Sequence, residues 1–171
     1  MSKFWLKTYI KEKIEKVGMP LKDWDIQINY GINTGFNEAF IIDGKTKDEL
    51  ISKSPKNAEI IRPILRGRDI KRYGYEFADK WLICTQNGTE HSPAINIDDY
   101  PDIKGYLDQY ITQLSKRQDK GVTPYNLRSC AYMDDFSKQK VMWKIIGCNL
   151  NFFYDTEGFY CNNAVNIMTG K

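Results

Sequence analysis

A run of basic residues between positions 62 and 72 is the leading candidate for binding chemistry in this sequence. Its cationic side chains are Arg62, Arg66, Arg68, Lys71 and Arg72. Guanidinium groups bind phosphates or guanine edges through paired hydrogen bonds, and lysine adds a point charge. Gly67 lets the backbone turn at this point and approach a ligand closely. The alternative interpretation is a solvated charged surface in which Asp69 pairs with one of the arginines.

Three further segments combine amide, hydroxyl and aromatic side chains in loop-like sequence. Their polar candidates are Asn33 with Thr34, Asn126 with Arg128, and Asn162 with Asn163. Asparagine can pair with adenine through two hydrogen bonds, and tyrosine can stack on a base or hold a phosphate. The same residue types also occupy ordinary turns, so no single segment defines a binding surface by itself.

Residues suited to catalysis are sparse. His91 is the single histidine and lies in a polar loop, without a cysteine or serine motif that would complete a catalytic triad. Gly31 and Gly35 lack the further glycine or lysine of a phosphate-binding loop. Asp102 and Lys120 loosely resemble the carboxylate and lysine of magnesium-dependent nucleases, which need carboxylates on adjacent strands. Asp102 is instead expected to open a helix, where an acidic residue favours the helix dipole.

Composition describes a globular protein without a general basic coat. Hydrophobic residues make up 42% of the 171 residues, charged residues make up 27%, and the net charge is only +3. An anionic partner would therefore have to be met by a local patch of positive charge. The cysteines lie far apart without a Cys-x-x-Cys pair, which is typical of reduced thiols. Because no signal peptide and no long apolar run is seen, we expect a cytoplasmic protein that does not associate with a membrane.

Hydrophobic periodicity predicts a single mixed α/β domain of the α+β type, with a mostly antiparallel or mixed sheet. An amphipathic N-terminal helix is expected over residues 3–17, packed on its own domain. The clearest helix is predicted near residues 101–117, where apolar residues form one stripe. Strands are predicted from alternating or short apolar runs at residues 24–30, 40–42, 81–84, 141–146, 151–154 and 164–168.

Seven segments carry a resemblance to a known family. In chain order they are GINTGFNEAFIID (31–43), AEIIRPILRGRDIKRY (58–73), WLI (81–83), YPDIKGYLDQY (100–110), DKGVTPYNLRSCAY (119–132), KVMWK (140–144) and GFYCNNAVNIMTG (158–170). Together they resemble the TaqI-like C-terminal specificity domain. That domain is the target-recognition region of adenine-N6 DNA methyltransferases and of type IIG restriction-modification enzymes. The resemblance spans residues 24–170 and rests on the Leu-Arg-Gly-Arg-Asp-Ile run combined with the Gly-Ile-Asn-Thr-Gly turn.

The resemblance implies sequence-specific binding of double-stranded DNA beside a methyltransferase or endonuclease domain, supplied in cis or in trans. Residues 1–20 would then be a helix that connects to the catalytic domain, and residues 21–171 would be the target-recognition domain. The basic side chains expected to hold phosphates or a guanine edge are Arg66, Arg68, Lys71 and Arg72. The candidates for contacts with bases or backbone are Asn33, Thr34, Asn126, Arg128, Asn162 and Asn163.

Catalytic motifs of such enzymes are missing from the sequence. It contains no Asn-Pro-Pro-Tyr motif to hold a flipped adenine and no Gly-rich loop for S-adenosylmethionine. We therefore expect no enzymatic activity and no cofactor in this chain by itself. S-adenosylmethionine, and magnesium where the parent enzyme cleaves DNA, would bind only in the catalytic parts of that enzyme. Two alternatives stay open, namely a small Mg²⁺-dependent nuclease using Asp102 and Lys120, and a protein-interaction module that docks a partner through its basic N-terminal helix.

Overall fold

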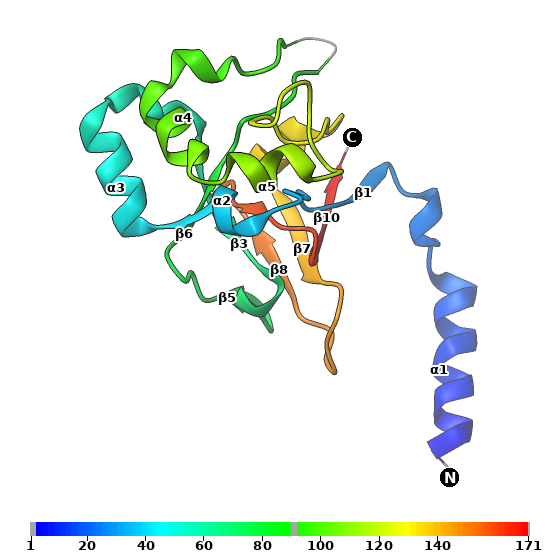
Figure 1. Ribbon diagram of the computed structural model, residues 1–171. Helices are drawn as coiled ribbons and strands as arrows, with labels where there is room; N and C mark the ends of the chain where they lie inside the picture. The colour runs from blue at the N-terminus through cyan, green and yellow to red at the C-terminus, as the bar shows by residue number, and fades with distance from the viewer. Residues whose placement is uncertain (1–2, 90–91, 171) are drawn as a thin grey trace.

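Two four-stranded sheets form the body of the protein in a computed structural model that describes residues 3–89 and 92–170 (Figure 1). His91 lies outside these described residues. The first sheet is antiparallel, in the order β1–β10–β7–β8, and contains β1 (Ile26–Tyr30), β7 (Lys140–Lys144), β8 (Phe152–Asp155) and β10 (Val165–Gly170). The second has the order β2–β6–β3–β9 and contains β2 (Ile41–Asp43), β3 (Ile61–Leu65), β6 (Lys80–Ile83) and β9 (Tyr160–Cys161). Only its β3–β9 pair is parallel, which confirms the predicted mixed α/β fold with antiparallel and mixed sheets.

Helices and a small hairpin complete the fold. The α-helices of the body are α2 (Asn37–Phe40), α3 (Gly44–Lys53), α4 (Pro101–Asp108) and α5 (Ile111–Lys116), and Figure 1 shows α3, α4 and α5 grouped at one end. The hairpin consists of β4 (Ile70–Lys71) and β5 (Gly74–Tyr75). Short 3₁₀ helices are η1 (Leu21–Asp23), η2 (Pro55–Ile60), η3 (Gly67–Asp69), η4 (Ile97–Asp99) and η5 (Met133–Ser137).

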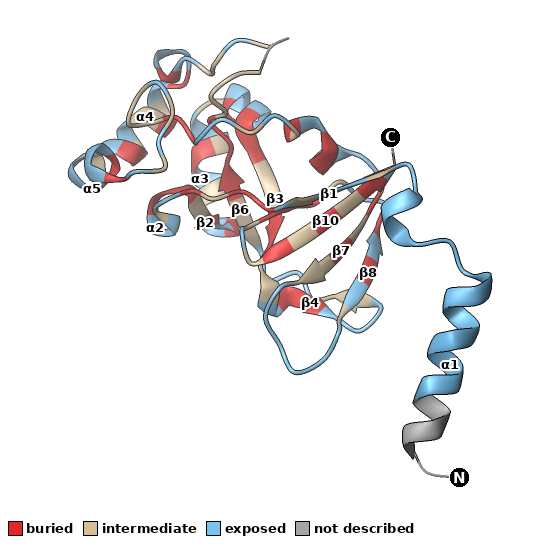
Figure 2. Ribbon diagram, turned by 90° about the vertical axis from the view of Figure 1, so that its right-hand side faces the viewer, coloured by how far each residue is buried: buried red, intermediate tan, exposed pale blue. Residues whose placement is uncertain are grey.

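The hydrophobic core follows the alternation that strands impose. Along β10, Val165, Ile167 and Thr169 are buried and the residues between them are partly exposed, as Figure 2 shows by its alternating colours. Successive side chains of a strand point to opposite faces, so one face of this sheet packs on the core. In the second sheet Ile64 and Leu82 are fully buried. The core therefore fixes the register of both sheets, and with it the loops at their ends.

The helix predicted near residues 101–117 is present as two helices, and the prediction of one continuous helix is wrong. α4 ends at Asp108, α5 begins at Ile111, and the backbone at Tyr110 leaves helical geometry with φ −114° and ψ 8°. The Tyr110 ring packs against Phe36 at 5.9 Å between ring centroids. Leu107 and Leu114 are both fully buried, so the apolar stripe continues across the break. The helix is thus interrupted at the residue that contacts a distant segment, although its own apolar pattern is continuous.

The N-terminal helix forms as predicted, but it does not pack on the domain. α1 (Lys3–Val17) stands away from the body in both ribbon views (Figures 1 and 2). Its apolar residues Ile10, Ile14 and Val17 are 48%, 61% and 77% exposed. Across the described part of the chain, no helix is long and apolar enough to cross a membrane. The expectation that α1 is a surface helix packed on its own domain is therefore wrong.

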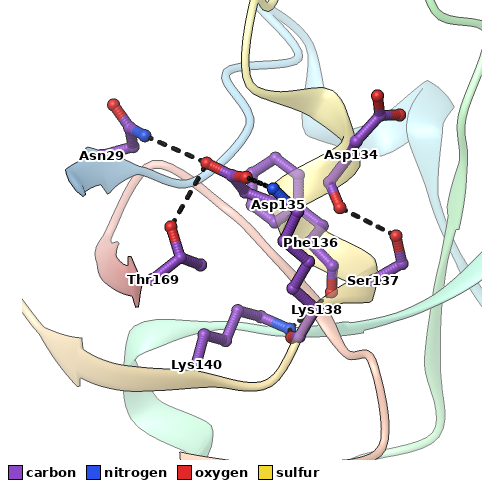
Figure 3. A network of polar contacts seen from close by, with 8 residues as sticks. All are labelled: Asn29, Asp134, Asp135, Phe136, Ser137, Lys138, Lys140 and Thr169. Carbon is purple, nitrogen blue, oxygen red and sulfur yellow. Dashed lines mark hydrogen bonds and ion pairs between the residues drawn. The ribbon is translucent and has the colours of Figure 1, made fainter. Parts of the chain in front are cut away.

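A buried ion pair and a polar network connect the first sheet to η5. The ammonium group of Lys140 is buried, where it pairs with Asp155 and donates to the carbonyl of Phe136. Asp135 accepts hydrogen bonds from Asn29 on β1 and from Thr169 on β10, and it pairs with Lys138 at 2.7 Å (Figure 3). These interactions hold η5, and the loop that leads into it, against the ends of three strands.

Candidate functional site

The polar segments singled out in the sequence meet around the β9–β10 turn. Ile32 forms a parallel bridge with Asn162, and the Gly31 amide donates to the Val165 carbonyl at 2.8 Å. The amide of Asn162 donates to the carbonyl of Leu65 at 3.2 Å, within the basic run and directly before Arg66. The structure therefore brings three segments, at residues 31–32, 65 and 162–165, to one surface.

Gly31 is required by this close approach. A Cβ atom at this position would lie 2.1 Å from the carbonyl oxygen of Asn162, which leaves no room for a side chain. Gly35 differs, because its φ of +68° is a left-handed conformation that favours glycine. The two glycines of this turn thus serve packing and backbone geometry.

One hollow of about 630 Å³ opens where the two sheets come together. We call it the basic hollow. Its lining residues are Asn37, Glu38, Ile41, Arg66, Gly67, Arg68, Lys80, Lys144, Ile146, Asn162 and Ala164. Four of these side chains are cationic and a single one is anionic, so the hollow attracts negative charge.

The cations of the basic hollow differ in whether an acidic side chain of the protein already lies close to them. Arg68 is exposed and, within the described residues, neither Arg68 nor Lys144 takes part in an ion pair. Lys80 lies opposite Asp43 in the β2–β6 pairing, and its charge helps to lower the pKa of that carboxyl, after the hydrogen bonds from Thr46. Arg68 and Lys144 are consequently the cations best placed to meet a phosphate.

Arg66 is held by Asp69 and is not a free cation. Its Nε and Nη2 atoms donate to the two carboxylate oxygens of Asp69, each at 2.9 Å, and its backbone amide donates to the same group at 2.8 Å. Burial raises the pKa of Asp69, but the hydrogen bonds and charge of Arg66, together with the charge of Arg68, outweigh that effect, so the net pKa is lowered. The pair closes the turn around η3, where a Cβ at Gly67 would lie 3.1 Å from the carbonyl oxygen of Ala164.

Lys71 and Arg72 lie outside the basic hollow, on the β4–β5 hairpin. Lys71 pairs with Glu76 at 3.1 Å, and the Arg72 guanidinium lies 5.2 Å from the centre of the Tyr73 ring. Both cations are exposed, and Tyr73 is 80% exposed. The remaining cation of the run, Arg62, donates to the backbone carbonyls of residues 58, 59 and 61. The basic run is therefore divided between two arginines held inside the protein, an exposed arginine at the hollow and two cations on a hairpin.

A second hollow of about 460 Å³ adjoins the first across the β9–β10 turn. We call it the amide hollow. It is lined by Tyr30, Gly31, Ile32, Asn33, Arg128, Ser129, Cys130, Ala131, Tyr132, Ile145 and Asn163. Arg128 is 67% exposed and pairs with Asp119 at 3.2 Å, while the Asn33 amide donates to the other oxygen of Asp119 at 2.8 Å. Asn33, Arg128 and Asn163, expected at a binding surface, thus share one concave site.

Thr34 and Asn126 are buried, and their side chains are engaged inside the protein. The Thr34 hydroxyl donates to Asn37 at 2.7 Å, and the Asn126 amide donates to the carbonyl of Ile95 at 2.9 Å. The Asn126 side-chain oxygen in turn accepts from the Thr123 hydroxyl. Their exposed fraction is 1% each, so both residues support the loops of the site from within.

Arg117 ties these loops together. Its guanidinium donates to the backbone carbonyls of Thr34, Asp119, Pro124 and Asn126, and it lies 4.6 Å from the centre of the Phe40 ring. Burial lowers the pKa of Arg117 to about 10, an effect that the charge of Asp119 opposes. Arg117 therefore fixes the turn after β1 against the loop of residues 119–129, the two walls that carry Asn33 and Arg128.

Asp102 and Lys120 do not form a nuclease-like arrangement. Asp102 lies in the first turn of α4, as predicted, and accepts a hydrogen bond from Asn57 at 3.2 Å. The Lys120 ammonium donates to the carbonyl of Ser115 at 2.8 Å. In the part of the chain that the structure describes, no three His, Cys, Asp or Glu side chains are grouped so that they could hold a metal ion. The geometry gives the nuclease alternative no support.

The sequence of this domain matches a known protein family. Residues 62–171 match the TaqI-like C-terminal specificity domain. The chain belongs to this family. The matched region includes the basic run, the loop of residues 119–129 and the β9–β10 turn, whereas Asn33 and the turn after β1 precede it. No curated protein matches the chain.

A solved structure shares the fold of this TaqI-like specificity domain. It is the type IIL restriction-modification enzyme MmeI in complex with DNA, with a TM-score of 0.61 and 11% sequence identity. The likeness covers 82% of this chain and 19% of that enzyme's chain, so the specificity domain here spans about a fifth of that neighbour. At this identity the likeness concerns the fold alone.

Sequence reasoning missed three residues of the specificity domain's candidate site. Lys80 and Lys144 are single lysines at strand ends, and only the folded sheets place them beside Arg68. Arg117 follows Lys116 at the end of a helix, and the sequence analysis did not single it out, yet Arg117 is buried. The sequence shows that basic residues are numerous, but it does not show which of them are buried in the folded protein.

Proposed function

We propose that this chain is the target-recognition domain of a larger DNA adenine-N6 methyltransferase or restriction-modification enzyme, and that it binds double-stranded DNA. The catalytic domain would be supplied in cis or in trans, and residues 1–20 would form the connection to it. S-adenosylmethionine, and magnesium in an enzyme that cleaves, would belong to those catalytic parts. The proposal places the protein with the DNA, in the cytoplasm.

The observation that carries the proposal is the pairing of two adjoining hollows of different chemistry. The basic hollow presents Arg68, Lys80 and Lys144, which suit phosphate oxygens. The amide hollow presents Asn33, Arg128 and Asn163, side chains that can donate to base edges or to the backbone. A duplex offers both partners side by side, since its phosphates flank its grooves.

Family membership and the geometry of the basic run support different roles for the cationic and amide side chains of the site. Arg68 and Lys144 would hold phosphates, and the hairpin cations Lys71 and Arg72 would extend this contact along the backbone. Asn162 lies between the two hollows and would contact either backbone or base. Arg66 and Arg117 would position these groups without touching DNA, because both are committed to partners inside the protein.

Measuring DNA binding against salt concentration tests the proposal directly. Each phosphate contact adds about 0.9 to the slope of log K against log salt on duplex DNA. Binding of the 171-residue chain to a labelled duplex, followed by fluorescence anisotropy, should therefore weaken steeply with salt. Arg68→Gln and Lys144→Gln should each reduce the slope by about 0.9 and weaken binding to all sequences alike.

Lys53→Gln is a matched control. Lys53 is an exposed lysine at the end of α3, where it lines a separate hollow with Asp102. Its replacement removes the same charge and should leave the slope unchanged. Absence of salt-dependent binding by the wild type, or equal slopes for all three variants, would overturn the proposal. Enrichment of one motif from a randomised duplex library would test the sequence specificity separately.

A further inference from the structure

The loop between β7 and β8 carries apolar side chains that the fold leaves uncovered. Ile146 and Leu150 are 86% and 80% exposed, and Ile145 is 48% exposed. Figure 1 shows this loop, in orange, reaching away from the body, and Figure 2 shows it as exposed along its length. Single exposed apolar residues are ordinary on protein surfaces. Three of them within six positions at a projecting tip form a patch that suits a partner.

The tip rises from an ordered base. The Trp143 and Phe152 rings pack at 5.7 Å between centroids, at paired positions of β7 and β8. The Asn151 side chain donates to the carbonyl of Ile70 at 3.2 Å, and the Tyr73 amide donates to the carbonyl of Phe152 at 2.8 Å. The loop is therefore braced against the β4–β5 hairpin, which limits the conformational entropy that it would lose on binding.

Positive charge surrounds the tip on both sides. Ile146 lines the basic hollow together with Arg68 and Lys144, and the Lys144 side chain folds over Gly147, where a Cβ would lie 2.5 Å from its Cε atom. On the other side the base adjoins Tyr73, whose ring is covered by the Arg72 guanidinium. Lysine is depleted from the centres of protein–protein interfaces. Apolar residues flanked by cations instead match a polyanion with an apolar interior, which is the chemistry of stacked bases between phosphate backbones.

We infer that the β7–β8 tip enters a groove of the bound duplex and that Ile146 and Leu150 contact its bases. The inference rests on the proposed function, because the cations beside the tip must first hold the backbone. Apolar side chains are used in this way by proteins that press against base steps or against the methyl group of thymine. The tip would thus supply contacts that depend on the base sequence, whereas the cations beside it would contact phosphates whatever the sequence.

The salt dependence of binding separates this role from a phosphate contact. Burying an apolar side chain against bases releases no counterions, so its loss lowers affinity without changing the slope of log K against log salt. Ile146→Ala and Leu150→Ala should each weaken binding about tenfold, at every salt concentration. The probe is the duplex pool that the wild-type chain itself enriches from a randomised library.

Val122→Ala is the matched control for removing an exposed apolar side chain. Val122 is 73% exposed and lies in a different hollow, with Ile95 and Pro124. Its variant should bind the pool as the wild type does. Because Ile146 and Leu150 are exposed, both variants should retain the wild-type melting temperature.

The outcomes distinguish this inference from the proposed function. Wild-type binding that is unaffected by Ile146→Ala and Leu150→Ala would overturn the inference and leave DNA binding intact. A slope reduced by about one would also overturn it, because the tip would then only support a phosphate contact. A wild-type dimer in sedimentation that Ile146→Ala dissociates would assign the tip to a second copy of the chain. Failure of the wild type to bind any duplex would overturn both proposals.

Discussion

Replacing Arg66 by alanine should destabilise the protein and leave the salt dependence of DNA binding unchanged. The Arg66 side chain is only 17% exposed and donates twice to Asp69, whose side chain is 5% exposed. Alanine would remove both side-chain donors from a buried carboxylate. The neighbouring Arg68→Ala, by contrast, removes an exposed cation that makes no hydrogen bond to Asp69, so it should change the slope and cost much less stability than Arg66→Ala.

The size of the effect follows from the two hydrogen bonds that alanine cannot make. A hydrogen bond to a charged group contributes about 1.5–3 kcal/mol, and the two bonds from Arg66 share one side chain, so they do not add fully. We expect Arg66→Ala to lower the free energy of unfolding by about 3 kcal/mol. Arg66→Lys keeps the charge but loses the planar pair of donors, and about half of that loss is expected.

A double-mutant cycle with Asp69→Ala isolates the pair. Urea denaturation at pH 7 gives the free energy of unfolding of the wild type, both single variants and the double variant. The coupling energy between Arg66 and Asp69 should be about 2 kcal/mol. Independent sites show coupling energies below about 0.5 kcal/mol, so a value in that range would refute a stabilising interaction between Arg66 and Asp69. So would a slope for Arg66→Ala that falls as far as that for Arg68→Ala.

The pH dependence provides an independent check on Asp69. Its pKa is lowered from the ordinary 3.8, so the unfolded chain takes up a proton at a higher pH than the folded protein. The stabilisation by Asp69 is therefore complete above that ordinary value and is lost as the pH falls through the folded pKa. The stability difference between wild type and Asp69→Asn should stay constant from pH 7 to about 5 and shrink below about 4.

Further predictions concern burial. Lys140→Met should destabilise the protein by about 3–5 kcal/mol in urea denaturation, because it leaves the buried Asp155 carboxylate without its cation; a loss below about 1 kcal/mol would contradict the buried pair. A thiol reagent at pH 8 should modify the exposed Cys148 in the native protein well before Cys84, since burial raises the pKa of the Cys84 thiol to about 12. Mass spectrometry that finds Cys84 labelled first would speak against that burial. Deleting residues 1–19 should leave the melting temperature unchanged, and a large decrease would show that α1 packs on the domain.

Local patterns in the sequence were sufficient to predict most of the longer strands, but they did not predict which strands pair with each other. The six predicted strands correspond to β1, β2, β6, β7, β8 and β10, because their alternating or continuous apolar runs depend only on nearby residues. β3 was missed, since Pro63 interrupts the strand pattern. The parallel pairing of β3 with β9 begins at Ile64, after the proline, so Pro63 does not prevent this pairing.

The candidate site was predictable as a set of segments but not as a set of contacts. The sequence indicated the arginine run and the asparagine-rich turns, and the fold brings them together. Which polar groups are buried depends on distant partners, as for Thr34 with Asn37 and for Asn126 with Ile95. Arg66 illustrates the same limit, since its pairing with Asp69 was one of two open interpretations and only the geometry of the η3 turn decides between them.

Arg117 has a consequence for how binding preferences can be changed. All four of its hydrogen bonds go to backbone carbonyls, which every amino acid provides. The bonds from Arg117 are therefore indifferent to the side chains of the two loops, whereas Asn33 and Arg128 add side-chain links to Asp119. Exchanging Asn33 and Arg128 would remove their bonds to Asp119 but would leave the four Arg117 bonds in place. Because the Arg117 bonds depend on no side chain of the two loops, a library that varies only positions 33 and 128 should still yield folded proteins, and its members should differ in the DNA that they select.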